Sequence, residues 1–386
     1  MRLAIMTARY GQNVVGGAEG QARALAEAAV ARGWQVQVWT TCAESHVSWE
    51  NTAAAGTTNI NGVTVQRFLV DPWDPLPFGQ YHVELLQTAY RDTAVQRKWI
   101  ESGPRSQELY DHVAAHAGEF DVVMALPYVA LLLYPAIELA ADRVVLWPCM
   151  HNEIYAYMRP IREKIERVWA TAFFSPEEAE LALGPIGLRL QRHAVIGGGV
   201  SIASIEQAVE PDLDNPYILY MGRLEEGKNL PLLYDYMVRY VNAGGGVRLV
   251  TIGSGSYKPP PHPAFDHRGF VTEDEKARLL AGALATCQPS LFESFSLVMM
   301  ESWLAERPSL VHEGCAVTRG HVTRAKGGLY FGTYGDFSGA LDWLLANPNL
   351  AARMGRNGRS YVERNFTWPA VLDRFETMIH HWQSES

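Results

Sequence analysis

Short apolar runs alternate with segments of helical periodicity along most of the chain. The run RLAIMTA at residues 2–8 is followed by a glycine-containing loop, then by alanines and leucines at helical spacing that stop at Gly33. Apolar runs of this length predict buried strands, and apolar positions three and four apart predict helices. Further strands are predicted at residues 34–40, 63–70, 121–127 and 143–150. This alternation predicts a parallel sheet with helices on both faces.

The alternation restarts after residues 194–216, a stretch rich in glycine and proline that also contains DLD at 212–214. Strands are predicted at 217–222 and 247–253, and the chain of 386 residues ends in three predicted helices. A chain of this length suggests two domains. We therefore predict two doubly wound α/β domains, residues 1–205 and 206–368. We interpret DLD as part of the linker between them.

Composition and charge exclude several classes of protein. The net charge is -9, whereas a nucleic-acid-binding protein normally carries a basic surplus. The four cysteines lie far apart without a CxxC pair, which is typical of buried thiols in a reducing compartment. The N-terminal apolar run is too short for a signal peptide, and no window of 18 apolar residues predicts a membrane span. We expect a cytoplasmic protein.

Glycines follow predicted strands at the edge where open α/β sheets bind ligands. Gly16 and Gly17 stand just before a predicted helix, whose first N–H groups suit a phosphate. The same glycines would also suit a tight turn. Gly253, in IGSGSY, permits close approach of a ligand to the backbone.

The segment GRLEEGKNL at 222–230 is close to a phosphate-binding P-loop but departs from it. Asn229 stands where Ser or Thr would bind Mg²⁺, and two adjacent glutamates would repel a phosphate. We therefore do not predict an NTPase. Arg223 and Lys228 remain, and this pair can neutralise a diphosphate. The alternative is that both are surface cations near a helix start, a position where the helix dipole disfavours positive charge.

Two acids, Glu293 and Glu301, bracket seven uncharged residues in FESFSLVMMESW. If the run is helical, the two acids are about 12 Å apart along the axis, too far to share a proton. That spacing suits contacts with two places on one long ligand. It also fits an exposed acid on a helix face preceded by an acid at the helix start.

The order of GGAEGQARALAEAAVARG, YILYMGRLEEGKNL, VTIGSGS, RGFVTEDEKARLLAGA and PSLFESFSLVMMESW resembles the retaining glycosyltransferases of family 4. The resemblance covers nearly the whole chain and includes the Glu-(seven residues)-Glu signature. It implies the GT-B fold, two Rossmann-like doubly wound domains facing a cleft, with a C-terminal helix at about residues 369–386 packed back on the first domain. It also implies sugar transfer from a nucleotide-diphosphate sugar to an acceptor, without a metal or other cofactor.

The resemblance implies roles for individual residues. Glu301 would hold the ribose hydroxyls, Glu293 would contact the transferred sugar, and Arg223 with Lys228 would contact the diphosphate. His151, after a late strand of the first domain, would lie near the sugar and the acceptor. The other residues that the resemblance places against the donor are Gly16, Gly17, Gly253, Phe270, Val271, Phe295, Ser296 and Leu297.

Two departures from the family are visible. Ser296 stands where the signature usually has glycine, so its side chain would crowd the donor sugar or form a hydrogen bond with it. Residues 312–328 replace a shorter, acidic loop and carry Arg319, His321 and Arg324. We hypothesise that this basic cluster faces the cleft and recognises an anionic group of donor or acceptor. A solvated loop fits equally well.

Saccharide, lipid-linked and natural-product acceptors all remain open. Aromatic residues could stack on a sugar or an aglycone, or could pack in the core; these are Trp73, Phe78, Tyr81, Tyr128, Tyr155 and Tyr157. The basic stretch at residues 157–169 could touch an anionic membrane surface from the cytoplasmic side. A solvated helix face explains the same pattern.

Three alternatives remain. One is another nucleotide-sugar enzyme of this fold, an epimerase or a hydrolase. Another is a degenerate protein that binds a nucleotide sugar without catalysis, against which the intact acids and cations argue. The third is an NAD-dependent dehydrogenase, which requires a complete glycine fingerprint and an acid at the end of the second strand, where Glu44 is placed only loosely.

Overall fold

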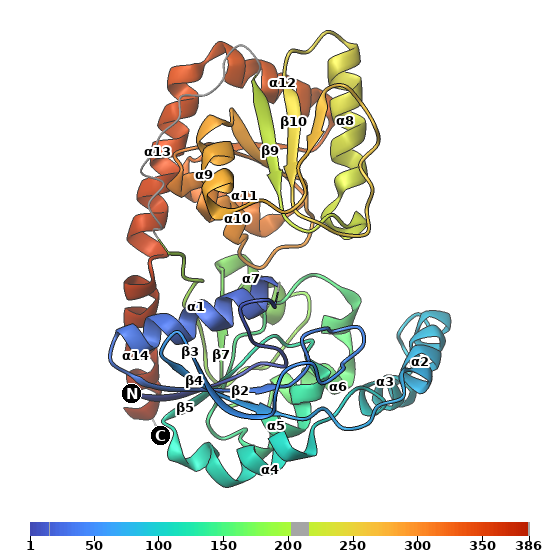
Figure 1. Ribbon diagram of the computed structural model, residues 1–386, viewed down its shortest axis with the longest axis vertical. Coiled ribbons are helices and arrows are strands. Elements are labelled where there is room, and N and C mark those ends of the chain that lie inside the picture. The colour runs from blue at the N-terminus through green and yellow to red at the C-terminus, as the bar shows by residue number, and fades with distance from the viewer. Residues whose placement is uncertain (15, 202–215, 385–386) are drawn as a thin grey trace. The chain divides into compact units, whose positions relative to one another are not determined.

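The computed structural model describes residues 1–14, 16–201 and 216–384, and it divides into two compact units. The first unit comprises Met1–Gly199 and Val371–Ser386, and the second comprises Val200–Ala370. Each unit is a sheet with helices against it (Figure 1). The predicted boundary at 205/206 and the DLD segment lie outside the described residues. No helix in the described part of the chain is long and apolar enough to cross a bilayer.

The first unit contains an eight-stranded sheet in the order β3-β4-β2-β1-β5-β6-β7-β8. All neighbouring strands are parallel except β3 and β4, which form an antiparallel hairpin. The strands are β1 (Arg2–Met6), β2 (Gln35–Thr41), β3 (Gly56–Ile60), β4 (Val63–Phe68), β5 (Val122–Ala125), β6 (Val144–Leu146), β7 (Ala170–Phe173) and β8 (His193–Val195).

The helices of the first unit follow the local signals of the sequence. Helix α2 begins at a proline and is capped by the Asp74 side chain, which accepts a hydrogen bond from Leu76 N–H. After α1, the chain turns at Gly33, whose φ is 86°. The helices are α1 (Gly17–Ala31), α2 (Pro75–Gln87), α3 (Thr93–Glu101), α4 (Gln107–His116), α5 (Tyr134–Leu139), α6 (Arg159–Ile165), α7 (Pro176–Leu183) and α14 (Trp368–Ser384).

The second unit is a six-stranded parallel sheet in the order β11-β10-β9-β12-β13-β14. Its strands are β9 (Tyr217–Met221), β10 (Arg248–Ile252), β11 (Phe265–His267), β12 (Ala285–Gln288), β13 (Ser309–His312) and β14 (Gly328–Phe331). Its helices are α8 (Leu230–Asn242), α9 (Glu273–Gly282), α10 (Leu297–Leu304), α11 (Ala316–Ala325), α12 (Tyr334–Ala346) and α13 (Pro348–Asn365).

Both faces of the second sheet are buried. Ile218 and Tyr220 of β9 belong to one apolar cluster, and Leu219 and Met221 belong to another. Successive side chains of a strand point to opposite faces, so two clusters along one strand require helices on both sides. Figure 1 shows this arrangement, with α8 on one side of the sheet and α9 and α10 on the other.

Strand order sets where each sheet can bind a ligand. In the second unit the chain runs from β9 through β10 to β11 and then returns to the other side of β9 as β12. The loops after β9 and β12 therefore leave the sheet in opposite directions, which opens a crevice at the carboxyl ends of these two strands. In the first unit the corresponding point lies between β1 and β5.

Helix α14 is the C-terminal element, and its residues from Val371 onward belong to the first unit. Arg32, just after α1, forms ion pairs of 2.6 Å with both Asp373 and Glu376. Arg374 Nε donates to the Ile196 carbonyl at 2.9 Å. These contacts hold the end of the chain on the first unit.

The structure contains elements that the apolar runs did not indicate. The antiparallel strand β3 precedes β4, and its residues are mostly exposed. The proline-rich and aromatic segment from residue 72 onward, for which no element was predicted, contains the helices α2 and α3. Residues 312–328, described above as a loop, contain the helix α11.

Candidate functional site

The loops after β9 and β12 are joined by an ion pair. Lys228, at the end of a short 3-10 helix, places its Nζ 2.7 Å from Glu293 Oε1. The two side chains are only 23% and 15% exposed, so the pair is partly shielded from water. Two predicted site residues, 65 positions apart in sequence, therefore meet at the switch point of the sheet.

The residue after Lys228 strengthens the same junction. Asn229 has φ 58° and ψ 30°, a left-handed conformation that asparagine adopts more readily than most residues. Its Nδ2 donates to the Pro289 carbonyl at 3.0 Å, which ties the β9 loop to the β12 loop a second time. The Asn that departs from the P-loop pattern thus has a structural role here.

Arg223 lies on the same loop but is held less firmly. Its side chain is 54% exposed, and its Nη1 lies 3.1 Å from Glu225 Oε1. The loop backbone beneath it is fixed, because the Tyr220 hydroxyl donates to the Arg223 carbonyl at 2.7 Å. The guanidinium can therefore turn toward a ligand at little cost, whereas Lys228 must share its charge with Glu293.

Gly253 is needed for contacts inside the protein. Its φ is 121°, and a Cβ built on it would lie 1.9 Å from the Gly222 carbonyl oxygen. Its N–H donates to the Gly269 carbonyl at 2.8 Å. The close backbone approach predicted for this glycine is thus an approach of the β9 loop, and its N–H is already engaged.

Glu301 lies on α10 and is paired with a residue that the sequence analysis did not select. Lys276, on α9, has its Nζ 3.5 Å from Glu301 Oε1 and 2.7 Å from Glu273 Oε2. Burial raises the pKa of the Glu301 carboxyl above its ordinary value, while the Lys276 charge acts in the opposite direction. The carboxyl is thus a half-buried acceptor whose pKa burial and Glu273 raise and Lys276 lowers.

Helix α10 begins at the segment predicted to contact sugar and phosphates. Leu297 is its first residue, and Ser296 precedes it as the N-cap with φ 69° and no side-chain capping bond. Phe295 is buried, with its ring 5.7 Å from that of His321 and 5.1 Å from that of Phe366. Glu293 lies four residues before α10, so it is in a loop and not on the helix.

The RGFV segment presents one apolar side chain to the surface. Phe270 is 70% exposed, whereas Val271 packs against an apolar cluster that includes Leu279 and Leu280. An exposed phenyl ring next to an anchored neighbour is suited to stack on a flat apolar group.

In the first unit, the predicted phosphate loop already contains a carboxylate. Gly16 is the N-cap of α1, and a Cβ at Gly16 would lie 2.0 Å from Glu19 Oε2. Glu19 pairs with Arg9, and both side chains are nearly buried. Gly17 has open space around it. The close neighbour of position 16 is thus the end of an acid side chain from the same helix, and a bound anion would compete with that acid for Arg9.

His151 follows β6 in the loop where it was predicted. Its Nδ1 lies 3.8 Å from Glu153 Oε1. The preceding residue, Met150, donates its N–H to the buried Glu178 carboxyl, which also accepts from Phe174 N–H at 2.6 Å. Burial raises the pKa of Glu178 to about 8, although these backbone donors act against the shift. Glu178 therefore anchors the loop that carries His151.

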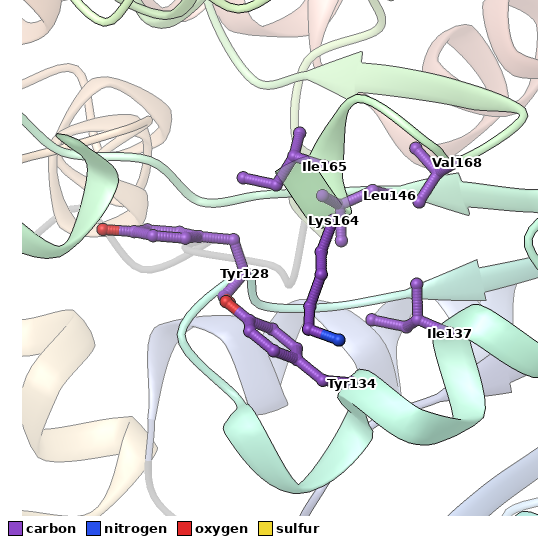
Figure 2. Close-up of a pocket in the computed structure, with 7 residues that line it drawn as sticks. All are labelled: Tyr128, Tyr134, Ile137, Leu146, Lys164, Ile165 and Val168. Atoms are coloured by element: carbon purple, nitrogen blue, oxygen red, sulfur yellow. The ribbon is translucent and has the colours of Figure 1, made fainter. Parts of the chain in front are cut away.

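The Tyr128 ring is buried and does not offer a surface on which a ligand could stack. Its ring is 1% exposed, and its hydroxyl donates to Glu153 Oε1 at 2.8 Å. Figure 2 shows that Tyr128, Tyr134 and Lys164 line a small, mostly apolar pocket. Its volume of about 10 Å³ holds roughly one water molecule. The hypothesis that the Tyr128 ring stacks on an acceptor is therefore wrong, because the ring lies in the core.

The basic cluster of residues 312–328 is also revised. His321 is buried on α11, and burial lowers its pKa to about 3, so it is uncharged near neutral pH. Its Nδ1 lies 3.0 Å from the Tyr361 hydroxyl, and Arg324 Nε donates to that hydroxyl at 3.2 Å. Arg319 is exposed. The three residues do not form a basic cluster on a loop, because one is a neutral core residue.

Two further surfaces of the first unit were considered as contacts for an acceptor or a membrane. Trp73 lines a cavity of about 260 Å³ together with Asp71, Asp74, Glu101 and Arg105.

The basic side chains of α6 are largely engaged in contacts within the protein. Arg159 pairs with Glu163, Lys164 pairs with Glu138, and Arg162 donates to the Gly187 carbonyl. The free positive charge of α6 is thus smaller than the sequence indicated.

Sequence reasoning missed Lys276, Glu19 and Glu178. Lys276 follows three acids in TEDEKARLL and looks like one member of a charged helix face. Its burial beside Glu301 depends on a helix 21 or more positions later in the chain. The signal that could have found Glu19 is its position in the first helical turn, where an acid is favoured.

Comparison with known proteins gives a family match over the part of the chain that contains Lys228 and Glu293. Residues 201–361 match the family described as glycosyl transferases group 1. The trehalose synthase of Rubrobacter xylanophilus is 25% identical over 178 residues, which cover 42% of this chain and 42% of that protein. The chain therefore aligns with less than half the length of this relative.

Solved structures resemble the whole chain. The sucrose-phosphate synthase of Thermosynechococcus elongatus has a TM-score of 0.70 and 16% identity, with 100% of both chains covered. The Anabaena protein HepE, in complex with UDP and glucose, has a TM-score of 0.68 and 13% identity, covering 98% of this chain and 99% of that one. The chain has the two-domain Rossmann-like α/β architecture of the GT-B fold, as predicted. The similarity to these solved structures concerns the fold, and the family match concerns residues 201–361, less than half of the chain.

Proposed function

We propose that this protein is a retaining glycosyltransferase that moves a sugar from a nucleotide-diphosphate sugar to an acceptor. The observation that carries the proposal is the Lys228–Glu293 pair at the switch point between β9 and β12, 2.7 Å between Nζ and Oε1. A lysine and an acid at this position offer one partner for an anionic diphosphate and one for sugar hydroxyls.

The donor is proposed to lie along the carboxyl edge of the second sheet. Glu301, half-buried on α10, would accept hydrogen bonds from the ribose hydroxyls, and Phe270, 70% exposed, would stack on the base. The diphosphate would lie near Lys228, Arg223 and the first N–H groups of α10. Because HepE was solved with UDP and glucose, UDP and UDP-glucose are the first ligands to test.

Catalysis would consist of positioning and of stabilising the leaving diphosphate. Lys228 and Arg223 would neutralise the charge that develops there, so we propose that no metal ion is required. Glu293 would orient the sugar, and His151 would lie near the acceptor. The acceptor would attack from the face that the diphosphate leaves, with a donor phosphate oxygen taking its proton. We propose a cytoplasmic location for this reaction.

Ligand binding provides the first test. Thermal unfolding would be measured with UDP, GDP, ADP, their glucose conjugates and NAD, with and without Mg²⁺. A ligand at 100 times its Kd adds about 2.7 kcal/mol of stability, which gives a clear shift. The shift should vanish in Glu301→Gln and persist in Glu273→Gln, which removes the 86% exposed partner of the same lysine. A shift with NAD alone would contradict the proposal.

Product analysis separates transfer from the alternatives. Incubation of the donor with candidate saccharide, lipid-linked and small-molecule acceptors should give a glycoside whose anomeric configuration, measured by NMR, equals that of the donor. Release of free sugar without acceptor dependence would favour a hydrolase, and an altered nucleotide sugar would favour an epimerase. Inversion at the anomeric carbon would contradict the retaining mechanism.

The Lys276–Glu301 pair predicts a pH dependence of donor binding. Lys276→Met removes a charge that lowers the Glu301 pKa, so the carboxyl should become protonated at a higher pH than in the wild type. If ribose binding needs the carboxylate, affinity falls as pH falls, and the midpoint of that fall should move upward in Lys276→Met. The measurement is the Kd of the best nucleotide between about pH 4 and 8.

Glu273→Gln is the control, and it should shift the pH midpoint of binding in the opposite direction, because Glu273 raises the Glu301 pKa. Its midpoint should move downward or remain in place. Equal midpoints in Lys276→Met and the wild type would show that nucleotide binding does not depend on the charge of Glu301.

A further inference from the structure

Ser296 combines two unfavourable features at one position. Its φ of 69° and ψ of 78° place a non-glycine residue in the left-handed region. Its side chain is 94% buried, since only 6% of the residue is exposed, and its Oγ has no hydrogen-bond partner among the described residues. Glycine would avoid both the backbone strain and the unpaired hydroxyl.

Packing on both sides of Ser296 keeps the backbone in this conformation. The Phe295 ring packs against the rings of His321 and Phe366, at centroid distances of 5.7 and 5.1 Å. On the other side, Met299 and Met300 of α10 are fully buried. A strained residue persists when its surroundings fix it in this way, and such residues concentrate at ligand-binding sites.

The hydroxyl lies at the start of α10, where a ligand oxygen would find other donors. The first N–H groups of a helix generally have no partner within it, and the helix dipole favours a negative charge there. In α10 the third of them, that of Met299, already donates to the Ser296 carbonyl at 3.2 Å, which leaves those of Leu297 and Val298. Ser296 is the N-cap, yet its Oγ does not cap the helix. Three residues earlier, Glu293 is paired with Lys228 at 2.7 Å, so the nearby carboxylate is balanced by a cation.

We propose that Ser296 Oγ donates a hydrogen bond to an oxygen of the donor diphosphate. The inference rests on the proposed function and replaces the contact with the donor sugar, which the sequence suggested for Ser296, by a contact with the diphosphate. We favour a phosphate oxygen over a sugar hydroxyl as the acceptor, because Ser296 Oγ lies at the positive end of the α10 dipole, which attracts an anion. In the bound state the unpaired hydroxyl gains its partner, which accounts for a serine where glycine would be less strained.

Two substitutions separate the hydroxyl from the backbone strain. Ser296→Ala removes Oγ and keeps Cβ, whereas Ser296→Gly removes both. Each variant should bind UDP and UDP-glucose about 10-fold more weakly, the loss of one hydrogen bond to a charged group of about 1.4 kcal/mol, and should bind uridine as well as the wild type. Calorimetry on the full chain measures these affinities. GDP or ADP and its nucleoside replace the uridine series if the nucleotide panel selects that base.

The ligand-free proteins supply a second readout. Ser296→Gly should raise Tm by about 2–4 °C because it relieves the left-handed strain, and Ser296→Ala should raise it less. An unchanged or lower Tm in Ser296→Gly overturns the argument from strain.

The binding outcomes are distinct. Unchanged affinity for UDP in both variants overturns the inference while the proposed function stands. A loss confined to UDP-glucose assigns the hydroxyl to the sugar and likewise overturns the phosphate contact. A wild-type protein that binds no nucleoside diphosphate overturns the proposed function together with this inference.

Discussion

Lys228→Ala is expected to lower the rate of sugar transfer by about 10²–10³-fold, the usual effect of removing one charged group that stabilises a leaving group. The reason is the position of Lys228 Nζ, 2.7 Å from Glu293 in the loop pair that the donor diphosphate would enter. The substitution also leaves the mostly buried Glu293 carboxylate without its partner. The free energy of unfolding should therefore fall by about 1–3 kcal/mol. Steady-state kinetics and urea unfolding measure the two effects.

Two variants serve as controls for Lys228→Ala. Arg223→Ala removes a cation that is 54% exposed and paired only loosely, so it should reduce the rate without measurable loss of stability. Glu293→Gln frees Lys228 and removes a negative charge beside the diphosphate. Binding of the nucleoside diphosphate should then become tighter while transfer slows. Weaker diphosphate binding in Glu293→Gln would contradict the competition between carboxylate and phosphate for one lysine.

Gly253→Ala is expected to destabilise the second unit by about 4 kcal/mol or more, at the upper end of single-substitution effects. The new Cβ would lie 1.9 Å from the Gly222 carbonyl oxygen, and alanine is strained at a φ of 121°. Because Gly222 begins the loop that carries Arg223 and Lys228, any folded variant should also lose diphosphate affinity. Thermal and urea unfolding provide the measurement.

Gly246→Ala is the matched substitution. Nothing lies within 4 Å of a Cβ built on Gly246, and its φ lies outside the left-handed region. It should leave stability unchanged or raise it by about 0.4–1 kcal/mol. If both variants were equally stable, the contact between the β9 and β10 loops would not be required for the fold.

Local patterns predicted the fold because each buried strand is a short apolar run on the sequence itself. Strand β9, for example, is predicted at 217–222 and observed at Tyr217–Met221. The edge strand β3 was missed because its residues, GTTNI, are mostly exposed and carry no apolar run. Its pairing with β4 depends on the hairpin and not on burial.

The candidate site was predictable in its parts and not in its pairings. Lys228 and Glu293 were selected separately, and their contact depends on the order of strands β9 and β12. The charge of His321 could not be predicted, because Phe295, Tyr361 and Phe366 surround it from other parts of the chain. For the same reason, counting arginines and lysines on α6 overstated the free charge of that surface.

The attachment of α14 to the first unit has a consequence for synthesis on the ribosome. Trp34 and Trp169 of the first unit contact Phe375 and Trp382 of α14, at ring centroid distances of 6.1 and 5.8 Å. These partners emerge only after residues 200–370 have been translated, which takes roughly 10–30 s. During that interval the nascent first unit exposes two tryptophans that the finished protein covers. Its last folding step therefore waits for α14, although all eight strands of its sheet are made first.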